Sequence, residues 1–320
     1  MKPLIELVAV RKHFPVSRGF FKTKALTVKA VDDVDLVIRR GETLGIVGES
    51  GCGKSTLGRL ILRLEEPTQG KVYYEGHDMA SFSSGRLQQL RAKLSIIFQD
   101  PYASLNPRKS VYSIIGEGMK IHRVCSHLEM RGRIIDILNQ VGMSEDSLDR
   151  YPHEFSGGQR QRIGIARALA LSPELIIADE PVSSLDVSIQ AQIINILTSL
   201  KERFGLTYVF ISHDLSVVRY MSDRVAVMYL GRIVELSRKD ELYKKPLHPY
   251  TVALLSAVPT IGRNGRKRRI ILRGDIPSAI FVPSGCRFHT RCPEVQDICK
   301  KEMPPLEDKG GGNLCACHFR

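Results

Sequence analysis

The sequence predicts an α/β fold built on a buried parallel sheet, and three observations lead to it. A glycine-rich stretch at residues 48–55 stands between an apolar strand pattern and a helical pattern. A continuous apolar run at residues 175–178, which ends in Asp179, is typical of a parallel strand that is buried on both faces. Similar runs recur at residues 94–98, 207–211 and 224–228, with helical patterns between them. We therefore expect strands and helices to alternate.

Further elements are expected around this sheet. The segment between Gln99 and residue 156 is mostly helical, with helices over residues 110–122 and 129–141. The helix over residues 188–203 carries apolar side chains on one face, which we interpret as core packing. Three short β segments are interpreted as an outer antiparallel layer: residues 4–10, 33–39 and 71–75.

The glycine-rich stretch fits the pattern G-x-x-x-x-G-K-[ST] of a phosphate-binding loop. Its glycines allow backbone N–H groups to curve around phosphates, Lys54 neutralises their charge, and the Ser55 hydroxyl reaches Mg²⁺. A strand over residues 43–47 enters the loop, and the helix over residues 55–63 points its positive dipole end at the phosphates. The loop predicts these nucleotide-binding residues: Gly48, Ser50, Gly51, Gly53, Lys54, Ser55 and Thr56.

Two acidic residues follow the apolar run at residues 175–178. Ligands of open parallel sheets bind at the carboxyl ends of the strands, so we expect both acids to face the nucleotide. Asp179 would hold Mg²⁺ through water. Glu180 would polarise the water that attacks the γ-phosphate, because phosphoryl transfer depends on positioning and charge neutralisation.

Four further motifs complete a family resemblance. Gln99 stands in Ile-Phe-Gln-Asp, residues 156–159 read Ser-Gly-Gly-Gln, Asp186 ends Ser-Leu-Asp, and His213 stands in Ile-Ser-His-Asp. Together with the phosphate loop, these motifs resemble, in kind and order, those of the ATP-binding cassette ATPases. The resemblance implies that Gln99 touches Mg²⁺ and faces a membrane partner, and that His213 contacts the γ-phosphate. It implies ATP and Mg²⁺ as ligands.

Residues 156–159 resemble the signature motif of the family, and a physical argument also supports a role for them in binding an anion. Ser156 can cap a helix over residues 157–171, and the two glycines allow the start of that helix to approach an anion closely. In the family, this helix start meets the ATP that the other subunit of a cassette dimer holds. The resemblance therefore assigns these residues to the partner's ATP: Ser156, Gly157, Gly158, Gln159 and Asp186.

The adenine-stacking residue is less well defined by the sequence. The family stacks adenine on an aromatic residue upstream of the phosphate loop, and Phe14 matches that place. The segment from residue 15 to residue 29 disturbs the spacing, and Phe20 and Phe21 remain rivals.

Composition favours a cytoplasmic protein that works beside a membrane. The 320-residue chain is 43% hydrophobic, which argues against disorder, and has no apolar run long enough to span a bilayer. Its start contains an acid and does not resemble a signal peptide. The net charge of +13 fits an anionic nucleotide and an anionic membrane surface, although nucleic acid would also satisfy it.

The composition changes near residue 240, and we expect two domains. Residues 1–245 are predicted to form the nucleotide-binding domain, with a helical subdomain at about residues 100–165. Residues 246–320 are predicted to form a C-terminal extension. Its basic run at residues 263–269 is interpreted as a solvated linker, with binding of lipid head groups as the sharper alternative.

Five of the seven cysteines lie in this extension. An odd count in a reducing cytosol disfavours disulfides, and the irregular spacing matches no common zinc ribbon, although Cys and His together could hold zinc. Four thiolates can hold an iron–sulfur cluster. A proline directly after a ligand cysteine, as at Cys292-Pro293, recurs in bacterial ferredoxins.

The extension narrows the resemblance to the ATPases of oligopeptide, dipeptide and nickel importers. Their cysteine pattern implies a [4Fe-4S] cluster, with Zn²⁺ as the alternative, and Cys315 is an extra thiol. Residues 51–54 and 157–162 further resemble the second of the two ATPases that such systems pair. The cluster ligands would be Cys286, Cys292, Cys299 and Cys317.

We therefore expect the ATP-hydrolysing subunit of a peptide importer, at the cytoplasmic face of the inner membrane. Its partners would be a sister ATP-binding subunit, in a heterodimer, two integral membrane permeases and, indirectly, a solute-binding protein. Nickel or another solute remains open as cargo. A cassette protein that acts on DNA or ribosomes is disfavoured because the chain lacks a coiled-coil insertion and a second cassette, so we expect no nucleic acid partner.

Overall fold

The computed structural model describes residues 3–16, 26–258 and 269–320. The chain divides into two compact units. The first contains Arg39–Thr43 and Met79–Ile211, and the second contains Pro3–Ile38, Leu44–Asp78 and Ser212–Arg320.

The first unit contains three parallel strands. β6 (Leu94–Ile97) pairs with β7 (Leu175–Asp179), and β7 pairs with β8 (Thr207–Ile211). Every residue of β7 and β8 is buried, which explains why the sequence there is apolar without alternation. The three strands confirm the predicted ones, with β6 one residue shorter than expected.

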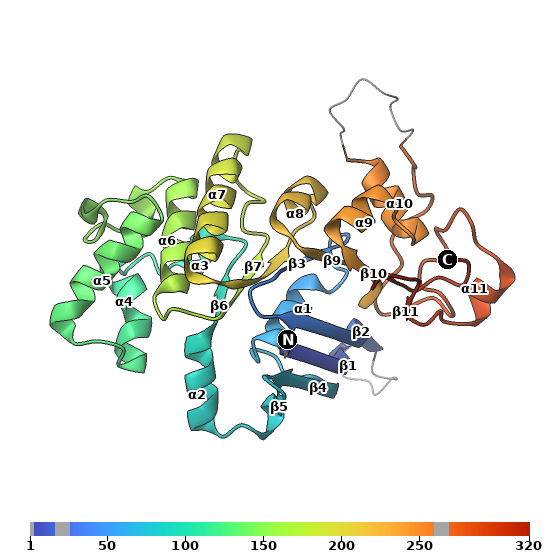
Figure 1. The fold of residues 1–320 in the computed structure, drawn as a ribbon, viewed down its shortest axis with the longest axis horizontal. Helices are drawn as coiled ribbons and strands as arrows, with labels where there is room; N and C mark the ends of the chain where they lie inside the picture. The colour runs from blue at the N-terminus through green and yellow to red at the C-terminus, as the bar shows by residue number, and fades with distance from the viewer. Residues whose placement is uncertain (1–2, 17–25, 259–268) are drawn as a thin grey trace. The chain divides into compact units, whose positions relative to one another are not determined.

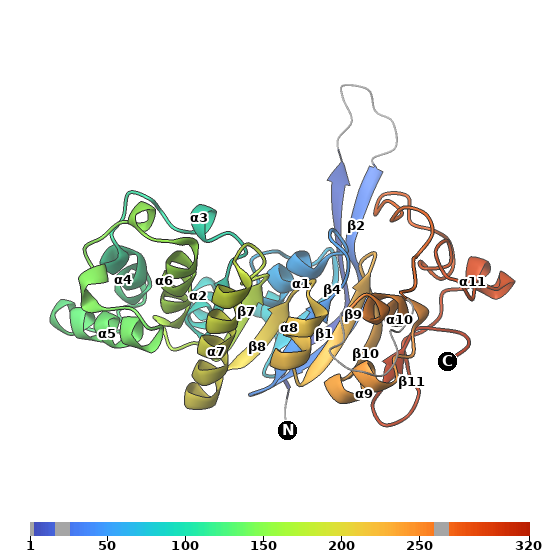
Figure 2. The same ribbon diagram turned by 90° about the horizontal axis from the view of Figure 1, so that it is seen from above.

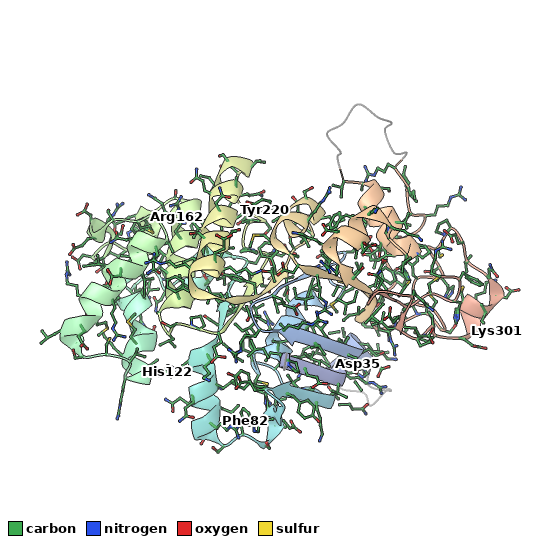
Figure 3. All side chains as sticks on the ribbon, in the orientation of Figure 1. Asp35, Phe82, His122, Arg162, Tyr220 and Lys301 are labelled. Atoms are coloured by element: carbon green, nitrogen blue, oxygen red, sulfur yellow. The ribbon has the colours of Figure 1, made fainter. Side chains whose placement is uncertain are left out.

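Helices of the first unit gather around α6 (Gly157–Leu169) (Figure 1). Arg162, labelled in Figure 3, donates from Nη1 to the Val141 carbonyl at 2.9 Å and from Nη2 to Gln192 Oε1 at 2.8 Å. The predicted helices are confirmed. The structure also has a helix that was not predicted, α2 (Ser84–Lys93). Leu90 is the only buried residue of α2, so its sequence has no apolar stripe that would indicate a helix. The helices around α6 are α3 (Pro101–Ser104), α4 (Val111–His122), α5 (His127–Gln140) and α7 (Val187–Phe204). The unit also has 3₁₀ turns at Met79–Ser81, Glu145–Ser147 and Pro152–Glu154.

The second unit contains the predicted antiparallel layer, in the strand order β2-β1-β4-β5. Its two long strands extend well beyond the predicted segments (Figure 2). The four strands are β1 (Pro3–Val16), β2 (Leu26–Arg39), β4 (Gln69–Tyr74) and β5 (His77–Asp78).

A second group of strands in this unit carries the phosphate loop. β3 (Thr43–Val47) pairs in parallel with β9 (Arg224–Tyr229), and β10 (Arg232–Arg238) returns antiparallel to β9. The sequence did not predict β10, because buried Glu235 and Ser237 interrupt its apolar pattern. The remaining elements are α1 (Lys54–Ile61), α8 (Leu215–Met221), α9 (Lys239–Lys244), α10 (Pro249–Ser256), α11 (Asp297–Lys301), β11 (Glu307–Asp308) and β12 (Leu314–Cys315).

The fold class is therefore confirmed as α/β with an antiparallel layer and a helical part. Among the described residues, no helix is both long enough and apolar enough to cross a membrane.

A buried histidine begins α10 and predicts a pH dependence of stability. His248 is 1% exposed, and its Nδ1 accepts the Tyr250 N–H at 3.1 Å. Burial lowers its pKa from 6.5 to about 3. Between these two pH values, His248 is protonated in the unfolded chain and neutral in the folded chain. As the pH falls through this window, His248 should lower the free energy of unfolding by up to about 1.4 kcal/mol per pH unit.

The variant His248→Asn keeps a capping acceptor but does not titrate. Urea unfolding at about pH 7, 6 and 5 should therefore give a smaller loss of stability on acidification for the variant than for the wild type. Equal losses in the two proteins would contradict the prediction.

Candidate functional site

The phosphate loop connects β3 to α1 in the second unit. Gly53 has φ 106°, and a Cβ at this position would lie 2.0 Å from the carbonyl oxygen of Ala30, so only glycine fits. The Lys54 side chain is 5% exposed and turns into the loop. Its Nζ donates to the carbonyl oxygens of Gly48 at 2.8 Å and Glu49 at 3.1 Å. Ser55 and Thr56 form the first turn of α1, half-buried.

The acidic residues at the end of β7 lie in the first unit together with Gln99. Nε2 of Gln99 donates to Oε2 of Glu180 at 3.1 Å. Glu180 has φ 47°, a left-handed conformation that costs a non-glycine residue about 1–2 kcal/mol, and its N–H donates to the Ile211 carbonyl at 2.9 Å. Strained backbone of this kind is typical of functional sites. Asp179 is the last residue of β7 and is 8% exposed.

Ser156 caps α6, as its sequence position predicts. Its Oγ accepts the Gln159 N–H at 3.3 Å, and Oε1 of Gln159 accepts the Ser156 N–H at 3.0 Å, so the two residues form a capping box. A Cβ on Gly158 would lie 2.6 Å from Cγ2 of Ile189 in α7. Packing of α6 on α7 is therefore a second reason for glycine at this position. Ser156, Gly158 and Gln159 line an open hollow of about 740 Å³.

The remaining predicted residues lie at the ends of other elements. Asp186 is the exposed N-cap of α7 in the first unit. His213 is exposed, stands two residues after the last residue of β8 and belongs to the second unit. Phe14 is half-buried in β1, and the Lys12 ammonium lies 4.9 Å from the centre of its ring. Its rivals Phe20 and Phe21 lie outside the described residues, as do residues 263–268 of the basic run.

One set of contacts to the phosphate loop was not predicted. The carboxylate of Glu49 accepts two hydrogen bonds from Arg291, and the backbone N–H of Glu49 donates to the Tyr250 hydroxyl at 3.0 Å. Both partners stand more than two hundred positions further along the chain. No local pattern could have revealed them, because spacing carries no information at that separation.

The prediction of a [4Fe-4S] cluster in the extension is wrong. Within residues 3–16, 26–258 and 269–320, no three His, Cys, Asp or Glu side chains are grouped as metal ligands, which also leaves zinc without a site. The cysteines named as ligands line a cavity of only about 20 Å³, room for about one water molecule. Burial raises the pKa of Cys286 to about 11. These cysteines are Cys286, Cys292, Cys299 and Cys317.

The fifth cysteine of the extension has a structural role. Cys315 lies in β12, is 0% exposed and pairs with Glu235 of β10 and with Glu307 of β11. Burial raises the pKa of its thiol to about 12. Cys315 is therefore a small buried side chain of a strand that lies between β10 and β11.

Two family models match the chain. Residues 31–183 match the model described as ABC transporter, and residues 234–299 match the one described as oligopeptide/dipeptide transporter, C-terminal region. The chain is 54% identical to the oligopeptide transport ATP-binding protein AppF of Bacillus subtilis, over 99% of this chain and 97% of the relative. It is 49% identical to the dipeptide transport ATP-binding protein DppF of Haemophilus influenzae, over 98% and 96% of the two chains.

Solved structures of ATP-binding cassettes are similar to the chain. A dimeric, post-hydrolysis structure of the cassette MJ0796 with ADP and phosphate matches with a TM-score of 0.65 and 29% identity, over 73% of this chain and 98% of that one. The cassette cbiO1 of Clostridium perfringens, part of an ABC transporter complex, matches with a TM-score of 0.65 and 26% identity, over 79% and 94% of the chains.

Proposed function

This chain belongs to the ABC transporter family of ATP-binding proteins, and we propose that it hydrolyses ATP to drive the import of peptides. One observation carries the proposal: an ABC transporter region and the C-terminal region of oligopeptide/dipeptide transporters follow one another in the same chain. Relatives that match it over nearly their whole length are named for oligopeptide and dipeptide transport.

Within this function, the phosphate loop binds the triphosphate and Phe14 stacks on adenine. Ser55, Gln99 and Asp179 would hold the Mg²⁺ that accompanies ATP, since hydroxyl, amide and carboxylate oxygens are the ligands that this cation prefers. Glu180 accepts the proton of the attacking water, and His213 contacts the γ-phosphate. The strained backbone at Glu180 and its hydrogen bond from Gln99 support these roles.

The second ATP-facing surface is the start of α6, with Asp186 beside it in the family pattern. We propose that Ser156, Gly157, Gly158 and Gln159 bind the ATP of a second ATP-binding subunit, because a capped helix start with two glycines presents N–H groups to an anion. A heterodimer with a sister subunit fits the pairing of ATPases in such importers. A dimer of this kind would act on two permeases at the cytoplasmic face of the inner membrane, with peptides delivered by a solute-binding protein. The division into residues 1–245 and 246–320 stays a prediction.

Transport assays test the proposal directly. Deleting the gene should lower the uptake of radiolabelled dipeptides and tripeptides about tenfold or more and leave nickel uptake unchanged, and the wild-type gene should restore it. The variant Lys54→Ala should fail to restore uptake because the phosphates lose their neutralising ammonium. The exposed-site variant Glu202→Gln serves as the control that restores it. If only nickel uptake were lost, the cargo would be nickel and not peptides. If transport were unchanged and the chain bound ribosomes or DNA, the proposal would be overturned.

A further inference from the structure

We infer that Arg291 and Tyr250, in the C-terminal segment (residues 246–320), are positioning residues for ATP, because both bind Glu49 of the phosphate loop. The inference rests on the proposed binding of ATP at residues 48–55 and deepens it. It gives the C-terminal segment a part in the nucleotide site that does not depend on metal.

The guanidinium of Arg291 binds the Glu49 carboxylate with two parallel hydrogen bonds. Nη1 donates to Oε2 at 2.7 Å and Nη2 donates to Oε1 at 3.0 Å. The side chains of Arg291 and Glu49 are only 8% and 24% exposed, so water screens the pair weakly. The hydrogen bond to Glu49 raises the pKa of Arg291 above its ordinary value. A two-bonded pair fixes the direction of the carboxylate as well as its charge.

Tyr250 binds the backbone of Glu49. Its hydroxyl accepts the Glu49 N–H at 3.0 Å, and the whole side chain is 0% exposed. The ring packs against Tyr229 and Phe288, with centroid distances of 4.7 and 5.3 Å. A ring enclosed in this way has little freedom, so the hydroxyl is a fixed point for the start of the loop.

The segment that carries Arg291 is itself anchored. Arg287, four residues earlier, forms a buried ion pair with Asp32 and donates to the Leu230 carbonyl. Its side chain is 5% exposed and that of Asp32 10% exposed. Phe288 lies between these two arginines in sequence and packs edge-on against Tyr229. Arg291 is therefore presented to the loop from a rigid base.

The pairing has an electrostatic consequence for a triphosphate. Glu49 directly follows Gly48, the first residue of the phosphate loop, and an unpaired carboxylate there would repel the phosphate charges. The Arg291 guanidinium cancels that charge at close range. Losing Arg291 should weaken binding for two reasons, because the loop becomes freer and the carboxylate becomes uncompensated.

Nucleotide binding to the full chain tests the inference, with MgADP as the probe in isothermal titration calorimetry. We expect Arg291→Ala to raise the Kd about tenfold and Tyr250→Phe about threefold. Arg291→Lys keeps the charge but not the paired hydrogen bonds, so its Kd should lie between those of the wild type and Arg291→Ala. Lys300→Ala, which breaks an exposed ion pair with Asp297 in the same segment, is the control and should leave the Kd unchanged.

A second change separates positioning from simple destabilisation. Adding Glu49→Gln to Arg291→Ala removes the uncompensated charge, so the double variant should bind MgADP about threefold more tightly than Arg291→Ala alone. In the assembled transporter, Arg291→Ala should raise the KM for ATP and change kcat less than twofold. A Kd equal to that of the wild type in Arg291→Ala would overturn the inference and leave the proposed function intact. Absence of MgADP binding by the wild type would overturn both.

Discussion

Replacing Glu180 with glutamine is expected to lower ATP turnover by about 10²–10⁴-fold while the affinity for MgATP stays within about threefold of the wild type. Glutamine has nearly the shape of glutamate and retains an oxygen that can accept the hydrogen bond from Nε2 of Gln99, which measures 3.1 Å. Its amide is neutral and does not take a proton from the attacking water. The backbone at this position can also remain as it is, because the N–H of residue 180 still bonds to the Ile211 carbonyl.

Phosphate release by the assembled transporter, with ATP in excess, gives the turnover, and nucleotide retained on a filter gives the binding. The closed dimer should accumulate with ATP, since hydrolysis no longer resets it. Glu202→Gln makes the same chemical change on the exposed face of α7 and should turn over ATP like the wild type. Turnover of Glu180→Gln within about threefold of the wild type would remove Glu180 from the proposed role.

Replacing Gly53 with alanine is expected to destabilise the chain by about 2–5 kcal/mol and to abolish nucleotide binding. The left-handed φ of 106° costs an alanine about 1–2 kcal/mol. The overlap of its Cβ with the Ala30 carbonyl oxygen, at 2.0 Å, adds about 1–3 kcal/mol of strain. The loop must move to relieve that overlap, and the N–H groups that face the phosphates move with it.

Gly51 offers a matched control in the same loop. Its φ of 77° is also left-handed, but a Cβ there would meet nothing within 4 Å. Gly51→Ala should therefore cost only the backbone part, about 1–2 kcal/mol. Urea unfolding of the two variants and the wild type measures the difference. Equal losses for the two alanines would show that contact with Ala30 does not shape the loop.

Features encoded by neighbouring residues could be predicted from the sequence. Strands β7 and β8 match their predicted bounds, because strands buried on both faces have uninterrupted apolar sequences. The cap of α6 was predicted from Ser156 and the glycines that follow it, and its capping box follows from Gln159 three residues later. The phosphate loop could be recognised for the same reason, since its glycines and its lysine lie within eight consecutive residues.

Features that depend on distant contacts could not be predicted in this way. Glycine at position 158 was attributed to the approach of an anion, but the proximity of Ile189 is visible only once α6 and α7 are packed. Strand β10 was missed because Glu235 interrupts its apolar pattern. Glu235 can be buried there because its carboxylate accepts the N–H groups of Leu247 and His248, each at 2.8 Å. The spacing of cysteines, similarly, does not determine whether their sulfur atoms surround a space large enough for a cluster.

The contacts at Glu49 have a consequence for the order in which the protein is made. Glu49 leaves the ribosome 201 residues ahead of Tyr250 and 242 residues ahead of Arg291. Because synthesis runs from the N-terminus, the residues of the loop are made long before the residues that hold it. A nascent or C-terminally shortened chain therefore carries the complete phosphate motif without its supports. We therefore expect the finished chain to bind ATP more tightly than a nascent or shortened one.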